Sequence, residues 1–106
     1  MPVLPQQPTL ADFQRYVTEL EHERGFQDQD VLQKCLMLGE EVGELFKAIR
    51  KLSKMGIDAK SKVGTAAEEL ADVLIYLCAI ANRLDIPLEQ AFRDKEAVNH
   101  TRTWSR

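Results

Sequence analysis

Two short acidic segments carry the side chains that are best suited to chemistry in this 106-residue sequence. One reads GEEVGEL and the other EELAD. Each holds two carboxylates three residues apart, Glu41 with Glu44 and Glu69 with Asp72. On a helix this spacing places both members of a pair on one face, about 60° apart. Such pairs are suited to binding a cation or to moving a proton.

Both pairs face the apolar side of the helix that would carry them. Glu69, like Glu41, falls among the apolar positions of its helical wheel, and a carboxylate facing a core is costly unless it is paired or metal-bound. The basic residues on the same two helices lie far from the acids in sequence. Lys34 is about two turns before Glu41, and Arg83 ends the later helix. A metal is therefore the better counter-charge, and all-oxygen ligands favour Mg²⁺, or Mn²⁺, over zinc. The flanking apolar residues are Leu38, Leu45, Ala48 and Leu52 around Glu41, and Ala66, Val73, Tyr76, Leu77 and Ile80 around Glu69.

Other interpretations of the acids remain open at this point. Acidic residues on helices commonly form solvated faces or ion-pair ladders, and Glu68 fits the third position of a capping box. A non-catalytic helical module for oligomerisation or regulation would use the same apolar stripes for subunit contact. A ferritin-like di-iron site would need a Glu-x-x-His pair, which neither His22 nor His100 completes near these acids.

The apolar spacing predicts an all-α fold with four helices, because no alternating strand pattern is long enough to count. Two long central helices carry the acidic segments. The sequence MGIDAKSKVG between them is a strong linker signal that allows the two helices to run antiparallel. The expected bounds are a cap at Asp28 or Asp30 with an end near Lys54, the linker at 55–64, and a cap at Thr65 with an end near Leu84.

Two shorter helices complete the four-helix bundle that we expect for one protomer. The first begins at a Thr9 cap and stops at Gly25, and the last has Pro87 in its first turn and reads LEQAFRDKEAVNHT. Residues 1–8 hold three of the four prolines and are expected to form an extended arm. Residues 9–104 then form a single helical domain.

Composition excludes several classes of protein. The net charge is −3, which argues against a partner that is a nucleic-acid polymer. The chain has no apolar run near the ~18–20 residues of a membrane span, and its start lacks the pattern of a signal peptide, so we expect a cytoplasmic protein that does not engage membranes. Cys35 and Cys78 lie in apolar helical patterns and are expected to be reduced core thiols.

The two acidic segments together resemble a known family. EEVGEL followed by EELADVLIYL is similar to the MazG-type all-α nucleoside triphosphate pyrophosphohydrolases, a group that includes dimeric dUTPases and dCTP pyrophosphatases. The resemblance extends from about Leu10 to Trp104, and Lys95, Asn99 and Arg102 also match the family pattern by type and spacing. It implies Mg²⁺-dependent cleavage between the α- and β-phosphates, with a house-cleaning role toward nucleotides.

The resemblance also implies a role for each acid. Glu41, Glu44, Glu69 and Asp72 match the Mg²⁺ ligands of the family. Glu40 matches a further acid of the motif, which would hold a further metal or orient the attacking water, so Glu40 and Glu41 are the catalytic candidates.

Basic and amide side chains are expected to bind the triphosphate. The resemblance assigns this role to Lys95, Asn99 and Arg102. Six of the 14 basic residues fall between positions 47 and 62, where most are typical of a helix C-terminus, and we assign Lys47 among them to phosphate. The family forms dimers or tetramers with sites near subunit interfaces, so a homodimer or homotetramer is expected.

Overall fold

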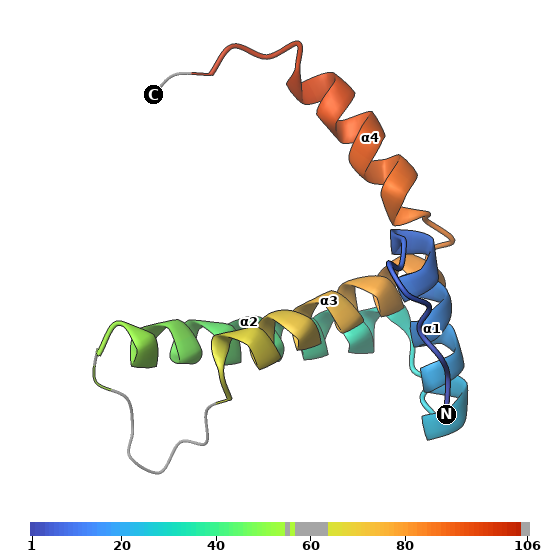
Figure 1. The fold of residues 1–106 in the computed structure, drawn as a ribbon, viewed down its shortest axis with the longest axis horizontal. Coiled ribbons are helices and arrows are strands. Elements are labelled where there is room, and N and C mark those ends of the chain that lie inside the picture. Colours follow the sequence, from blue (N-terminus) through green and yellow to red (C-terminus); the bar gives the residue numbers. More distant parts are fainter. Residues whose placement is uncertain (55, 57–63, 105–106) are drawn as a thin grey trace.

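A computed structural model describes residues 1–54, 56 and 64–104 of the chain, and Figure 1 shows its arrangement. The described residues form four α-helices and contain no strand, as the apolar spacing predicted. None of these helices is both long enough and apolar enough to cross a membrane. The helices are α1 (Leu10–Arg24), α2 (Val31–Leu52), α3 (Ala66–Arg83) and α4 (Leu88–Asn99).

Local capping signals fix the ends of α1. The Thr9 hydroxyl accepts a hydrogen bond from the Asp12 amide at 3.1 Å, and the Asp12 carboxylate accepts one from the Thr9 amide at 2.8 Å. Gly25 ends the helix in the left-handed conformation, with φ at 75°. Both predicted ends of this helix are therefore confirmed.

The long helices also begin at residues that the sequence indicated. Asp30, rather than Asp28, caps α2 in a capping box with Gln33. Thr65 caps α3, and the Glu68 carboxylate meets the Thr65 hydroxyl instead of its amide, so only half of the predicted capping box forms. The predicted linker at 55–64 lies outside the described residues except for its glycines at 56 and 64.

The helices α2 and α3 run antiparallel, side by side, and α1 packs across one end of α3 (Figure 1). Val17, Cys78 and Ala79 form the buried core where α1 meets α3. The core thiol predicted at Cys78 is confirmed, whereas Cys35 is exposed on α2. Residues 1–8 contain no helix or strand.

The expectation that all four helices close into a bundle within one chain is wrong. The helix α4 packs mainly on α1, points away from the α2–α3 pair and has no buried residue (Figure 1). Its direction is set at the preceding turn, where the Gln14 side chain accepts a hydrogen bond from the Leu88 amide at 2.9 Å and donates one to the Ile86 carbonyl at 2.8 Å. Pro87, expected inside the first turn, is instead the N-cap and gives no side-chain cap, so Gln14 supplies the missing acceptor.

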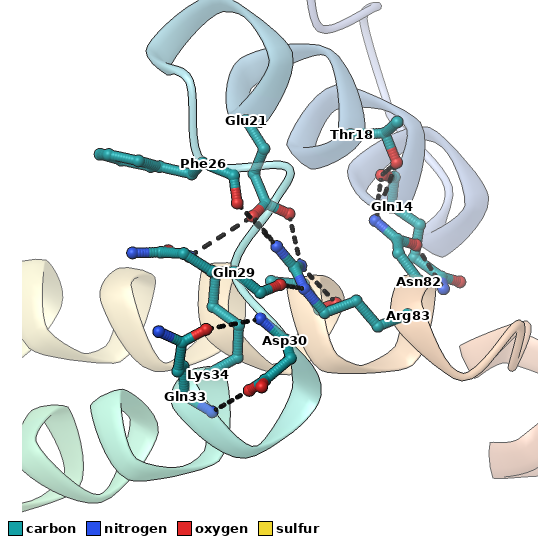
Figure 2. A network of polar contacts seen from close by, with 11 residues as sticks. Gln14, Thr18, Glu21, Phe26, Gln29, Asp30, Gln33, Lys34, Asn82 and Arg83 are labelled. Carbon is teal, nitrogen blue, oxygen red and sulfur yellow. Dashed lines mark hydrogen bonds and ion pairs between the residues drawn. The ribbon is translucent and has the colours of Figure 1, made fainter.

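A buried ionic network joins α1, α2 and α3, as Figure 2 shows. Arg83 makes two hydrogen bonds to the Glu21 carboxylate, at 2.9 and 2.6 Å, and the Lys34 ammonium lies 3.4 Å from the same carboxylate. Burial would raise the pKa of Glu21, but the Arg83 and Lys34 charges outweigh it and lower that pKa. The sequence analysis missed this network, although Glu21 shares the helical face of Val17 and that position could have indicated its burial.

Candidate metal centre

Three carboxylates converge between α2 and the N-terminal part of α3. One oxygen each of Glu41 on α2 and of Glu69 and Asp72 on α3 lies within 4.8 Å of the others. The three-residue spacing on α3 directs Glu69 and Asp72 to one face, and the antiparallel packing of α2 brings Glu41 against it. Glu69 is buried at 8% exposure, and the other two are half-buried.

These three carboxylates carry like charges, and none has a cationic partner among the described residues. Burial raises the pKa of Glu41, and the charges of Asp72 and Glu69, together with a hydrogen bond to the Glu69 carboxyl, raise it further. Within the described part of the chain, no Lys, Arg or His nitrogen lies within 4.0 Å of any of the three carboxylates. A donor set made only of carboxylate oxygens, lacking an internal counter-charge, fits a hard divalent cation.

Tyr76 lies one turn beyond Asp72 on α3, and the sequence analysis regarded it as a packing residue. Burial raises the pKa of its phenol, and the charges of Glu41 and Asp72 raise it further. The hydroxyl therefore stays protonated at neutral pH and remains a hydrogen-bond donor beside the acids. The Lys34 ammonium lies 5.4 Å from the centre of its ring, which connects the acidic cluster to the buried ionic network. The four-residue spacing from Asp72 was the signal that could have identified it.

Glu40, Glu44 and Lys47 lie near the cluster on α2. Neither Glu40 nor Glu44 belongs to the three-carboxylate group within the described residues. Glu40 is exposed, whereas Glu44 is half-buried and lies 3.6 Å from the Lys47 ammonium. The charge of Glu44 still contributes to the raised pKa of Glu41. These residues therefore surround the cluster without completing it.

The residues expected on the last helix lie away from these acids in the same chain. Lys95 is exposed on α4, and the Asn99 side chain donates to the Glu96 carboxylate at 2.8 Å. The Arg102 guanidinium lies over the Trp104 ring, 5.2 Å from its centre. Because α4 points away from the α2–α3 pair, one chain alone does not bring these groups to its own acidic cluster (Figure 1).

Known proteins share this sequence pattern and this fold. Residues 27–102 match the MazG nucleotide pyrophosphohydrolase domain. The chain is 38% identical to dCTP pyrophosphatase 1 of Mus musculus over 101 residues, which cover 91% of this chain and 59% of that protein. It is 37% identical to the dCTP pyrophosphatase 1 of Bos taurus over 101 residues, covering 91% of this chain and 60% of that protein. The chain thus spans about three-fifths of the length of these relatives.

A solved structure resembles this fold over most of the chain. The crystal structure of iMazG from Vibrio DAT 722, in its Ntag form, aligns with a TM-score of 0.62 at 35% sequence identity. The alignment covers 92% of this chain and 99% of that chain. The similarity therefore extends to the helical architecture as well as to the sequence.

Proposed function

Because this chain belongs to the MazG nucleotide pyrophosphohydrolase family, we propose that it hydrolyses a nucleoside triphosphate to the monophosphate and pyrophosphate. The observation that carries this proposal is the convergence of Glu41, Glu69 and Asp72, each with one carboxylate oxygen within 4.8 Å of the others. A negatively charged cluster repels a triphosphate unless a cation lies between them. The geometry therefore fits a phosphate chemistry that depends on a metal.

Glu41, Glu69 and Asp72 would hold Mg²⁺, or Mn²⁺ in its place, and Glu44 on the next turn of α2 would add a fourth carboxylate. The bound cation would supply charge stabilisation on the phosphate oxygens and a more acidic water. Glu40 is exposed next to Glu41, so its carboxylate is free to accept the proton of the attacking water. Lys47 lies 3.6 Å from Glu44 and would turn from that carboxylate toward a phosphate group.

The phosphate-binding groups of α4 require a second copy of the chain. We propose a homodimer or homotetramer in which α4 of one protomer brings Lys95, Asn99 and Arg102 to the acids of its partner. Large apolar side chains support this assembly, because they lie exposed on α2, α3 and α4 and would be covered by such contacts. They include Leu32, Leu36, Phe46, Ile49, Leu70, Leu77, Phe92 and Val98. Light scattering that gave a monomeric mass at micromolar concentration would contradict the assembly.

The relatives suggest which nucleotide to test first. Two of them are named dCTP pyrophosphatase 1, so dCTP is the proposed first substrate for this chain. Removal of an excess or non-standard nucleotide would be a house-cleaning activity, which would act on the nucleotide pool of the cytoplasm.

A panel of nucleotides tests the function. The purified protein is incubated with each ribo- and deoxyribonucleoside triphosphate, with and without Mg²⁺, and both pyrophosphate and monophosphate are measured. We expect equal amounts of the two products from at least one nucleotide, only when Mg²⁺ is present. If no nucleotide is cleaved and Mg²⁺ does not raise the melting temperature, the alternative of a non-catalytic helical oligomerisation or regulatory module is favoured instead.

A further inference from the structure

Gly64 lies directly before the helix that carries two of the three acids. It precedes Thr65, the N-cap of α3, and its backbone does not adopt the left-handed conformation that favours glycine. Among the described glycines, only Gly25 has a positive φ. The backbone at position 64 would therefore accept an L-residue, and another reason for glycine must be sought in the space around it.

That space is taken by the Glu69 carboxylate. A β-carbon added to Gly64 would lie 2.5 Å from Oε1 of Glu69 and 3.3 Å from Oε2 of Glu68. Glu68 is exposed and can turn away, but Glu69 is only 8% exposed and lies in the acidic cluster. The first of these distances is well inside van der Waals contact, so an alanine at this position must displace the Glu69 carboxylate.

Helix geometry explains why these two residues meet. With Thr65 as the N-cap of α3, Gly64 occupies the N′ position and Glu69 the N4 position. Side chains at N′ and N4 commonly pack together, and when both are apolar they form a hydrophobic staple. In this chain the N4 residue is a buried acid of the candidate metal centre. A side chain at N′ would therefore press on a carboxylate that must stay in place.

We propose that Gly64 is a positioning residue whose missing side chain leaves room for the Glu69 carboxylate in the metal centre. This inference rests on the proposed function, since Glu69 matters here as a ligand. Gly64 does not touch the reacting atoms and acts only through the position of Glu69. Any larger residue at 64 moves one ligand of the cluster while leaving the helix itself intact.

The test is a titration of the full-length protein with Mn²⁺ alone, followed by electron paramagnetic resonance of the free ion. Gly64→Ala is expected to weaken Mn²⁺ binding by about 10- to 100-fold, in the range typical of changes that disturb ligand orientation. Its melting temperature without metal is expected to equal or exceed that of the unsubstituted protein, because alanine restricts the unfolded chain. Gly56→Ala is the matched control, since a β-carbon there meets no atom of the described residues within 4 Å and Mn²⁺ binding should not change.

A second substitution identifies the contact responsible. Glu69→Asp withdraws the carboxylate by one methylene group, so the β-carbon at position 64 no longer collides with it. We expect Glu69→Asp alone to weaken Mn²⁺ binding, and Gly64→Ala to add less than about twofold in that background. Such non-additivity between two sites indicates direct coupling. Fully additive losses would overturn the proposed contact.

The outcomes distinguish a failure of the role of Gly64 from a failure of the proposed metal centre. If the unsubstituted protein binds Mn²⁺, Asp72→Asn abolishes binding and Gly64→Ala binds as well as the unsubstituted protein, the role of Gly64 is overturned while the metal centre stands. If Asp72→Asn binds Mn²⁺ as tightly as the unsubstituted protein, both the metal centre and the role of Gly64 are contradicted.

Discussion

Two glutamates of this molecule occupy opposite electrostatic surroundings on the same helix framework. Glu21 is buried beside Arg83 and Lys34, and its pKa is lowered despite its burial. Glu41 is half-buried beside Glu69 and Asp72, and its pKa is raised. Among the residues that the structure describes, cationic partners therefore lie beside Glu21, whereas none lies within ion-pair distance of Glu41, Glu69 or Asp72.

Under the proposed function, this difference separates a structural ionic group from a functional one. The Glu21 network joins three helices and satisfies its own charges, so it contributes to the specific packing of α1 against the α2–α3 pair. In the acidic cluster the like charges repel one another, and under the proposed function a bound cation would offset this repulsion. Such local destabilisation is typical of sites that are retained for activity.

The largest expected effect comes from the acidic cluster. Asp72→Asn removes one charge and one anionic ligand while keeping the shape of the side chain. We expect a loss of several kcal/mol of transition-state stabilisation, or about a thousand-fold or more in kcat/KM. The helical content should be unchanged, and the metal-free protein should melt at the same or a higher temperature because repulsion with Glu41 is relieved.

Steady-state kinetics and circular dichroism check this pair of effects, and Glu41→Gln should behave in the same way. A variant that retained its turnover would remove the basis for the site. Loss of helical structure together with activity would show instead that the acids are needed for folding, and would contradict the distinction from Glu21.

The next largest effect is expected in the ionic network. Arg83→Met leaves the buried Glu21 carboxylate without its two closest hydrogen bonds. We expect the free energy of unfolding to fall by about 3–5 kcal/mol, the usual result of breaking a buried ion pair on one side. Urea denaturation measures the change, and Lys34→Met is the matched comparison with a smaller loss, since Lys34 lies 3.4 Å from the carboxylate. Equal and negligible losses for both variants would contradict the structural role of this network.

A smaller effect is expected where α4 begins. Gln14→Ala removes the acceptor for the Leu88 amide and two donated hydrogen bonds at the α3–α4 turn. We expect a loss of about 1–2 kcal/mol in stability, comparable to the loss of a helix cap. Hydrogen exchange should increase in α4 more than in α2 or α3. In the proposed assembly KM should also rise more than kcat falls, because α4 carries the phosphate-binding groups. A uniform increase of hydrogen exchange across all helices would argue against this role of Gln14.

The smallest effects should appear in the pH dependence of stability without metal. The folded-state pKa of Glu21 lies below its ordinary value of 4.5, so its contribution is complete above 4.5 and is lost as the pH falls through the folded-state pKa. The folded-state pKa of Glu41 lies above its ordinary value of 4.5, so the pH dependence runs the other way: the protonated carboxyl carries no penalty below pH 4.5, and stability decreases as the pH rises through the folded-state pKa.

Melting curves of Glu21→Gln and Glu41→Gln, measured across acidic pH, should therefore diverge from the parent curve in opposite directions. Glu21→Gln should lose stability mainly at neutral pH and converge with the parent in acid. Glu41→Gln should gain stability at neutral pH and also converge in acid. Parallel displacements in the same direction would contradict the electrostatic difference between the two regions.

Local features of the fold could be predicted from the sequence, because their causes lie within a few residues. Thr9, Asp30 and Thr65 cap helices through bonds to residues three positions away, and Gly25 ends one through its own backbone. The face on which Glu69 and Asp72 lie follows from their spacing alone. The convergence with Glu41 needed only the antiparallel pairing of two adjacent helices.

Features set by distant partners could not be predicted in this way. The direction of α4 depends on a bond between Gln14 and the Leu88 amide, which no periodicity reveals, so the single-chain bundle was wrongly expected. The network of Glu21 and Arg83 joins residues 62 positions apart. The space beside Gly64 depends on where the Glu69 side chain lies in three dimensions.

Anomalous diffraction at the manganese edge, from crystals grown with Mn²⁺, tests the central claim most directly. The account predicts an anomalous-difference peak within Mn–O bonding distance of carboxylate oxygens of Glu41, Glu69 and Asp72, and no peak beside Glu21. A map with no peak between α2 and α3, with the three side chains turned apart toward solvent, would contradict it.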